Sequence, residues 1–212
     1  MSGRSVRPGR GRPSTQDDQR LAEGRRTTAE LVRQARRLFS THGYHGTSTT
    51  QLVEATGLTR GALYHHFADK AALFAAVFEQ VYGEIGDAVE RAAARETDTW
   101  AQLVAGCDAF VVSGADASRA RIAFVDGPGV LGPERWAAID REHAEAGLES
   151  LLSSLQRDGL VRAAPLDALT QVLSGGMNAA VLWVAHATSS KRALAEARAA
   201  VRAVIEGLRV RA

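Results

Sequence analysis

The sequence has little cysteine and no long uncharged apolar run. Cys107 is the single cysteine among 212 residues, which excludes an internal disulfide and any metal site built from several cysteines, and fits a reducing compartment. The N-terminus, MSGRSVRPGRGRPST, has arginines but no apolar run after them, so a secretory signal is not expected. No apolar stretch approaches the roughly 18–20 residues of a membrane-spanning helix. The sequence therefore predicts a cytoplasmic protein.

Strand patterns and catalytic motifs are also missing. No segment alternates convincingly between apolar and polar residues, whereas apolar residues recur at helical spacing along most of the chain, which predicts an all-α fold of about nine helices. No Gly-x-Ser-x-Gly motif or cysteine cluster occurs. Asp140 and His143, three residues apart, are more typical of a surface pair than of a catalytic or metal site. We therefore expect no enzymatic activity, no metal and no cofactor.

Charge is present but unevenly distributed. Residues 1–70 contain 12 Lys and Arg against 6 Asp and Glu, whereas residues 71–212 contain 14 against 18. A basic head on an acidic body suggests that the head meets a polyanion, although a basic terminus without function is the alternative.

The first 20 residues are rich in Gly, Pro and Arg and have almost no apolar side chains. They bury too little surface to offset the entropy of ordering, so we predict a disordered arm over residues 1–20. Within it, Gly9-Arg10-Gly11-Arg12-Pro13 resembles an AT-hook core, in which arginines enter a narrow A·T minor groove. Arg10 and Arg12 are therefore candidate DNA contacts, and a solvated basic tail is the alternative.

The first helix is predicted from Thr27 to Gly43. Thr27 and Glu30 have the spacing of a capping box, apolar residues follow at helical period, and Gly43 is a suitable stop.

The next stretch, Ser48–Lys70, predicts two short helices around a tight turn. Ser48 and Gln51 form a second capping-box pair, and Gly57 suits an abrupt helix end. Thr59 then suits the N-cap of a helix that runs to Phe67. A short helix, a glycine turn and a second helix with compact and hydrogen-bonding outward residues are typical of a helix-turn-helix, which places its second helix in the DNA major groove. An ordinary helical hairpin is the alternative.

The stretch TSTTQLVEATGLTRGALYHHFADKAALFAAV resembles the N-terminal domain of the TetR family of transcriptional regulators. The pattern Ala55-x-Gly57-Leu58-x-x-Gly61-x-Leu63-Tyr64-x-His66-Phe67-x-x-Lys70-x-x-Leu73 matches the family motif closely. The resemblance is specific over residues 27–78 and looser over 99–210. It implies a DNA-binding domain over residues 21–70 and a helical ligand-binding and dimerisation domain over 71–212.

The resemblance also implies a role for each matching residue. Thr49 would contact phosphate, and Thr50 a base or a phosphate. Thr59 would cap the recognition helix, whose Arg60, Gly61 and Ala62 would face bases. The backbone contacts would come from three further side chains, namely Tyr64, His65 and Lys70. His66 has two readings, a phosphate contact or a hydrogen-bonded buried histidine.

Apolar residues at helical spacing predict further helices in the body, residues 71–212. A Gly- and Pro-rich loop between Asp126 and Gly132 interrupts them. Gly127-x-Gly129-x-x-Gly132 in this loop matches a dinucleotide-binding fingerprint, so a nucleotide-binding enzyme is the competing function. A Rossmann unit needs a parallel sheet, however, and the remaining chain predicts helices only.

A mostly apolar pocket for an unidentified small-molecule effector is expected between body helices. Asn178, on an otherwise apolar helix, is the expected polar anchor. The candidate ligand-binding residues are Cys107, Phe110, Trp136, His143, Met177 and Asn178. The last two helices are rich in Gly and Ala, and the resemblance implies that they pair with a second copy as a homodimer. The predicted function is a ligand-responsive repressor that binds a palindromic double-stranded DNA operator as a dimer.

Overall fold

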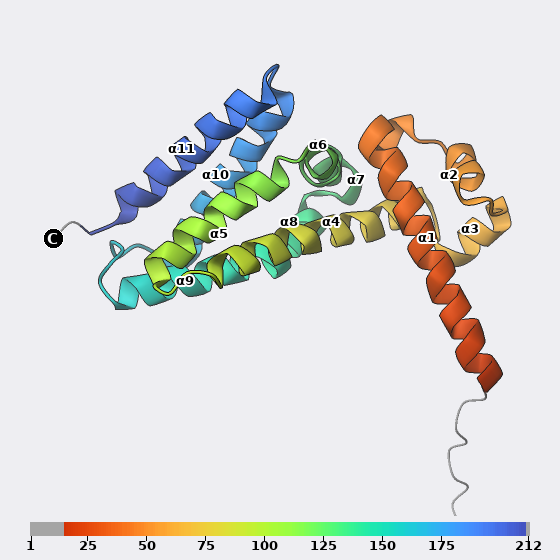
Figure 1. Ribbon diagram of the computed structural model, residues 1–212, viewed down its shortest axis with the longest axis horizontal. Helices are drawn as coiled ribbons and strands as arrows, with labels where there is room; N and C mark the ends of the chain where they lie inside the picture. The colour runs from red at the N-terminus through yellow and green to blue at the C-terminus, as the bar shows by residue number, and fades with distance from the viewer. Residues whose placement is uncertain (1–14, 211–212) are drawn as a thin grey trace, which may run out of the picture.

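The computed structural model describes residues 15–210, and their side chains from residue 19 (Figure 1). Three helices make up the head at one end of the molecule: α1 (Thr15–Gly46), α2 (Thr49–Thr56) and α3 (Arg60–His66). The long helix α4 (Lys70–Ala93) begins at the head and runs into the body.

The body contains the remaining helices. They are α5 (Thr99–Gly114), α6 (Ala117–Ala120), α7 (Gly127–Leu131), α8 (Pro133–Asp140), α9 (Ala146–Arg157), α10 (Leu166–His186) and α11 (Ser190–Leu208). Two π-helical segments, η1 (Arg121–Asp126) and η2 (Arg141–Glu145), join α6 to α7 and α8 to α9 without a break. With each joined run counted once, the described residues form nine helices and no strand, so the predicted all-α fold is confirmed.

A row of buried aromatic rings runs along α4 and connects head to body. Phe74, Phe78 and Tyr82 recur every four residues and are fully buried. Phe74 meets Phe39 of α1, with 5.3 Å between ring centroids, and Tyr82 meets Phe124 of η1 at 5.7 Å. The long helix therefore belongs to the cores of both parts.

Two expectations about local structure are wrong. α1 begins by Thr15 rather than at Thr27, so residues 15–20 are helical, and the Thr27 hydroxyl donates to the Glu23 carbonyl one turn earlier instead of capping. The expected loop from Asp126 is largely helical, because α7 occupies its centre. Arg10 and Arg12 lie outside the described residues.

A further correction concerns the length and hydropathy of α10. By length and composition, α10 is long and apolar enough to cross a membrane, contrary to the sequence expectation. In the structure this helix packs against α11, α5 and α9 in the body.

Candidate nucleic-acid interface and internal cavity

The turn between α2 and α3 has the local geometry that its sequence predicts. The Ser48 hydroxyl accepts from the Gln51 amide at 3.2 Å, and the Gln51 side-chain oxygen accepts from the Ser48 amide at 2.7 Å. Gly57 ends α2 in the left-handed region, with φ 68°. The Thr59 hydroxyl caps α3 by accepting from the Ala62 amide at 3.2 Å. These caps fix where each short helix starts and stops.

One face of α3 is buried and the other is free. Leu63 is 1% exposed and packs, with Leu52 of α2, into the core of the head. Arg60, Gly61 and Tyr64 are exposed on the opposite side. A Cβ added to Gly61 would meet only the Thr59 hydroxyl, at 4.0 Å, so this helix can approach another surface closely.

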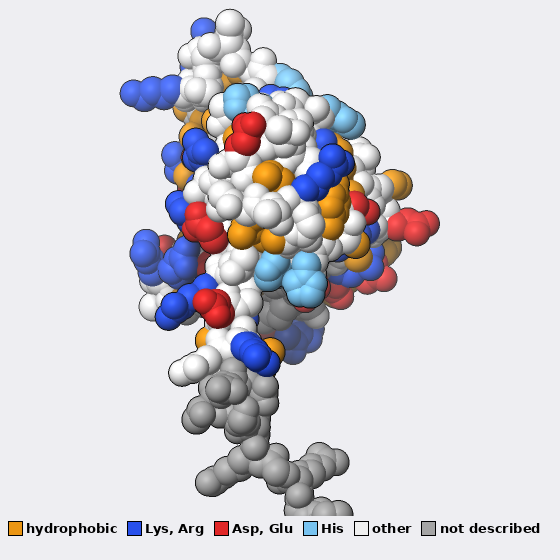
Figure 2. Space-filling view, turned by 90° about the vertical axis from the view of Figure 1, so that its right-hand side faces the viewer, with side chains coloured by type: hydrophobic (Ala, Val, Ile, Leu, Met, Phe, Trp, Pro, Cys, Tyr) orange, Lys and Arg blue, Asp and Glu red, His pale blue; other side chains and the backbone are white. Residues whose placement is uncertain are grey.

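Thr49, Arg60 and Tyr64 form one group across α2 and α3. The Arg60 guanidinium lies 5.8 Å from the centre of the Tyr64 ring. Hydrogen bonding to Thr49, and then to Arg60, lowers the pKa of the Tyr64 hydroxyl. Thr50, Thr59 and His65 are exposed beside this group. Viewed from the head end, blue and pale-blue side chains outnumber red ones on the exposed surface (Figure 2).

Lys70 has a structural role that the sequence did not reveal. Its ammonium donates to the carbonyls of Tyr44 and Thr47, both at 2.9 Å, and lies 4.1 Å from the centre of the Tyr44 ring. The start of α4 therefore holds the end of α1, and one ammonium N–H is left over. The Nδ1 atom of His66 lies 3.1 Å from the Thr28 hydroxyl. Of the two readings of His66, this contact fits the hydrogen-bonded histidine rather than the phosphate contact.

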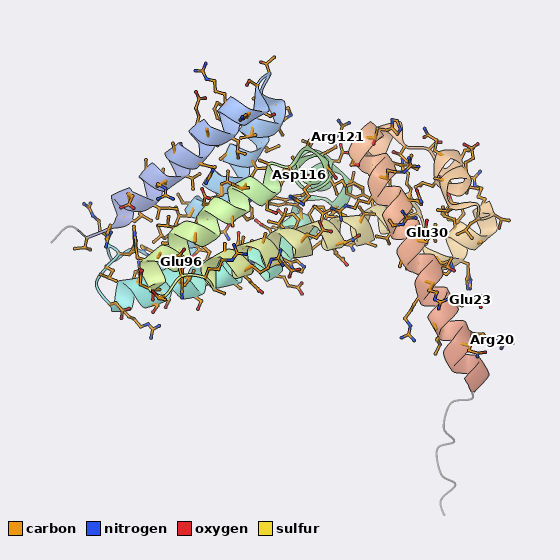
Figure 3. All side chains as sticks on the ribbon, viewed as in Figure 1. Arg20, Glu23, Glu30, Glu96, Asp116 and Arg121 are labelled. Carbon is orange, nitrogen blue, oxygen red and sulfur yellow. The ribbon has the colours of Figure 1, made fainter. Side chains whose placement is uncertain are left out.

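A second connection joins the end of α1 to η1 in the body. The Asp126 carboxylate accepts from the Tyr44 amide at 2.8 Å and lies 3.5 Å from the Arg121 guanidinium. At Gly43, α1 is kinked with φ 73°, and a Cβ there would come within 2.3 Å of the Arg121 side chain. Figure 3 shows Arg121 at this end of α1. Only glycine provides both the backbone angle and the space.

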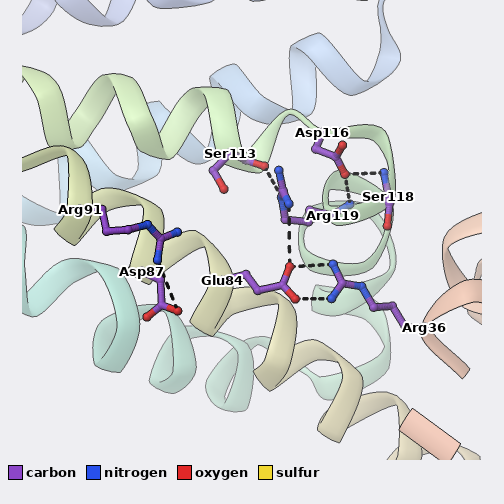
Figure 4. Close-up of polar contacts among 8 residues, drawn as sticks. All are labelled: Arg36, Glu84, Asp87, Arg91, Ser113, Asp116, Ser118 and Arg119. Atoms are coloured by element: carbon purple, nitrogen blue, oxygen red, sulfur yellow. Dashed lines mark hydrogen bonds and ion pairs between the residues drawn. The ribbon is translucent and has the colours of Figure 1, made fainter. Parts of the chain in front are cut away.

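A third connection is an ion-pair network around Glu84 of α4 (Figure 4). Both oxygens of Glu84 accept from the Arg36 guanidinium of α1, one of them at 2.7 Å. Arg119 of α6 lies 3.8 Å from the same carboxylate and donates to the Ser113 carbonyl at 2.6 Å. No local sequence pattern pointed to these residues, because the partners of Glu84 come from α1 and α6, far from it in the chain.

The body contains a mostly apolar cavity of about 380 Å³ between α4, α5, α9 and α10, which opens to the surface at Glu90 and Ser150. Of the six candidate ligand-binding residues, Cys107, Phe110 and Met177 line it. Burial raises the pKa of the Cys107 thiol to about 12, so this thiol stays protonated at neutral pH.

The other three candidates lie outside the cavity wall. The Trp136 indole donates to the Ala123 carbonyl at 2.9 Å. The His143 carbonyl lies so close to Gly86 that a Cβ there would be 2.9 Å away. Asn178 donates to the Asp140 carboxylate at 3.1 Å. Helical periodicity showed that these residues face inward, but not which inward neighbour each one meets.

A second apolar groove of about 470 Å³ lies between α10 and α11 and shares Cys107 and Met177 with the wall of the cavity. Small residues such as Gly176, Ala180 and Ala200 line it. Three of its larger lining residues are unusually exposed, with Val172 at 70%, Val204 at 56% and Trp183 at 50%. Both the groove and the cavity reach the surface, the groove through these residues and the cavity through exposed wall residues such as Glu90 and Ser150.

The glycines of the dinucleotide-like motif do not form a phosphate-binding loop. Gly127 lies in α7, where a Cβ would be 2.6 Å from the Phe78 ring, and only Gly132 of the three has a positive φ. Because no parallel sheet occurs in residues 15–210, the enzyme alternative loses its structural basis. Side chains in the described part of the chain also form no group of three or more His, Cys, Asp or Glu suited to a metal.

Two family profiles match the chain. Residues 31–77 match bacterial regulatory proteins of the tetR family, and residues 100–208 match the tetracyclin repressor-like C-terminal domain.

Similar proteins have been characterised or solved. A TetR-family transcriptional regulator from Pectobacterium atrosepticum is 33% identical with a TM-score of 0.76, over 90% of this chain and 97% of that one. The transcriptional repressor AcnR of Corynebacterium efficiens is 43% identical over 60 residues, which are 28% of this chain and 32% of AcnR. The TetC protein of transposon Tn10 from Escherichia coli is 26% identical over 70% of this chain and 75% of TetC. The match to AcnR thus spans about a third of that relative's length.

Proposed function

Because this chain belongs to the TetR family of transcriptional regulators, we propose that it is a dimeric repressor that releases its DNA operator when a small molecule binds in the body. Each recognition helix α3 enters a major groove of a roughly palindromic site. The Gly127–Gly132 enzyme alternative is not retained, and the cytoplasm is the expected location.

The group formed by the half-buried Thr49 and the exposed Arg60 and Tyr64 carries this proposal. The two caps hold α2 and α3 in a helix-turn-helix arrangement, and the free face of α3 presents Arg60 beside the compact Gly61 and Ala62. A guanidinium at the start of a recognition helix can donate two parallel hydrogen bonds to guanine. Phosphate contacts are assigned to the surrounding side chains, namely Thr49, Thr50, Tyr64, His65 and Lys70.

The first experiment selects bound sites from genomic DNA and compares Arg60→Ala with the parent protein. We expect Arg60→Ala to cost about 1–3 kcal/mol per half-site and to relax the preference at one base position. Arg95→Ala removes the same charge from an exposed position near the end of α4 and is the matched control. Equal weakening by Arg60→Ala on every sequence would refute base recognition by this residue.

The groove between α10 and α11 is the proposed dimer interface. Its exposed tryptophan and valines bury apolar surface only if another molecule covers them, and its small residues allow close helix approach. Trp183→Glu should convert the dimer to a monomer in light scattering coupled to gel filtration. A Trp183→Glu variant that remains dimeric would contradict this interface.

The cavity between α4, α5, α9 and α10 is the proposed effector site, with Cys107, Phe110 and Met177 in its wall. An effector releases DNA only to the extent that it binds the non-binding conformation more tightly. Genes beside the selected operators indicate compounds to try, and loss of operator binding on their addition is the readout.

A further inference from the structure

A stripe of polar residues follows one face of the otherwise apolar helix α10. Thr170, Ser174 and Asn178 recur every four residues, which places them on the same side of the helix. Thr170 and Ser174 are each 2% exposed, so this stripe faces the protein interior. Buried polar groups in native proteins normally have hydrogen-bond partners, and the partners here are incomplete.

The stripe meets a buried carboxylate at the end of α8. Asp140 is 2% exposed. Its Oδ2 accepts from the Ser174 hydroxyl at 3.3 Å and from the Asn178 amide at 3.1 Å, whereas its Oδ1 is buried without a partner. Among the described side chains, no Lys, Arg or His forms an ion pair with Asp140. Burial raises the pKa of this carboxyl group, because an unpaired buried charge is costly.

Three more buried polar atoms in the same cluster lack partners. They are the hydroxyl oxygens of Tyr82 and Thr170 and the side-chain oxygen of Asn178. Together with Asp140 Oδ1, all four unpartnered atoms are oxygens, and two of them only accept hydrogen bonds. Two acceptor-only oxygens, Asp140 Oδ1 and Asn178 Oδ1, are therefore without a donor, while the unpartnered Tyr82 and Thr170 hydroxyls can still donate.

The polar cluster adjoins the apolar cavity. Ser174 lines the cavity and donates to Asp140, so it is the side chain that joins the two. Glu90 is the only charged residue in the wall, and no Lys, Arg or His lines it. Glu145, also close to Asp140, lies 3.7 Å from the exposed Arg141 and accepts from the Gln171 amide at 2.8 Å. The charge in and next to the cavity is thus mainly negative.

We propose that the effector is an amphipathic organic cation, whose apolar part fills the cavity and whose protonated amine enters beside Ser174 to bind Asp140. This inference rests on the proposed effector role of the cavity. An ammonium group supplies a positive charge opposite Asp140 and donors for the two acceptor-only oxygens. A carboxylate or phosphate ligand would be repelled by Asp140 and Glu90, and a purely apolar ligand would leave the oxygens unpartnered.

The test uses three probes with the same eight-carbon chain: octylammonium, 1-octanol and octanoate. Their binding to the full-length protein is measured by isothermal titration calorimetry. We expect octylammonium to bind about tenfold to a hundredfold more tightly than 1-octanol, as a charge-assisted hydrogen bond provides, and octanoate to bind most weakly. Asp140→Asn keeps the shape of the side chain and should abolish the preference for octylammonium while leaving 1-octanol binding unchanged.

Asp87→Asn is the matched control, because it removes an acidic charge that is exposed on α4. It should retain the full preference, and circular dichroism checks the folding of both variants. Equal affinity for octylammonium and 1-octanol, an unchanged preference in Asp140→Asn, or no binding of any probe would overturn the proposal. Operator binding is measured separately, so a protein that binds DNA but not octylammonium refutes the ligand class alone. Binding of octylammonium without DNA recognition refutes the proposed regulator instead.

Discussion

Replacing Glu84 by glutamine should loosen the connection between head and body by a measurable amount. The variant keeps the side-chain shape but removes the charge that holds Arg36 and Arg119. The Glu84 side chain is 35% exposed and that of Arg36 is 23% exposed. A fully exposed ion pair contributes about 0–1 kcal/mol, and breaking a fully buried one costs about 3–5 kcal/mol. The partly buried pair of Glu84 and Arg36 falls between these two limits. We expect Glu84→Gln to lower the free energy of unfolding by about 1–2 kcal/mol at pH 7.

The pH dependence distinguishes this charge effect from a packing effect. Hydrogen bonding to Arg36 lowers the pKa of Glu84 below its ordinary value of 4.5. The stabilisation is therefore present above pH 4.5 and is lost as the pH falls through the lowered pKa. Urea unfolding at a series of pH values should show the difference between parent and variant shrinking toward zero in acid.

A control on the same helix sharpens the measurement. Asp87 lies 3.8 Å from Arg91, and both side chains are about two-thirds exposed, at 66% and 65% (Figure 4). Asp87→Asn should change the unfolding free energy by less than about 0.5 kcal/mol. The reasoning fails if Glu84→Gln is equally neutral at pH 7, or if its cost persists undiminished in acid.

Three further perturbations test other parts of the structure. Lys70→Met should lower the free energy of unfolding in urea by about 1–3 kcal/mol, because two carbonyls lose their donor. It should also reduce the slope of DNA affinity against salt concentration by about the share of one phosphate contact. Unchanged stability would contradict the structural role of Lys70. Gly127→Ala should cost about 1–3 kcal/mol by thermal unfolding because its Cβ meets Phe78, whereas Gly129→Ala, with no atom within 4 Å, should cost nothing. Deleting residues 1–14 should weaken binding to A·T-flanked operators in a gel-shift titration, and equal affinity would exclude the minor-groove contact.

Local capping chemistry explains most of what the sequence predicted correctly. Ser48, Gln51, Gly57 and Thr59 satisfy backbone groups within a few residues, so their effect on α2 and α3 is visible without the rest of the fold. The same reasoning misplaced the start of α1. Thr27 has the spacing of a cap, but its hydroxyl can equally bond back to Glu23 inside a longer helix.

Long-range packing explains what the sequence could not predict. The Gly127–Gly132 segment looked like a loop because glycine and proline weaken isolated helices, yet Gly127 is required where α7 packs closely against Phe78. The partners of Asp140 come from α10, 34 and 38 residues away. The four-residue spacing of Thr170, Ser174 and Asn178 was the one sequence signal of this cluster, and only Asn178 was recognised.

Helix α4 connects the two functions as a mechanical arm. Its first residue, Lys70, donates a hydrogen bond to the Tyr44 carbonyl at the end of α1. Residues near its other end, such as Glu90, line the cavity. Its 24 residues span about 36 Å at the rise of an α-helix. A tilt of about 5° at the cavity would therefore swing the head by about 3 Å. In a two-fold dimer the displacements of the two heads add to about 6 Å, a substantial mismatch against half-sites about 34 Å apart. In the proposed repressor, a ligand that tilts α4 by a few degrees would thus move both recognition helices out of register with their half-sites.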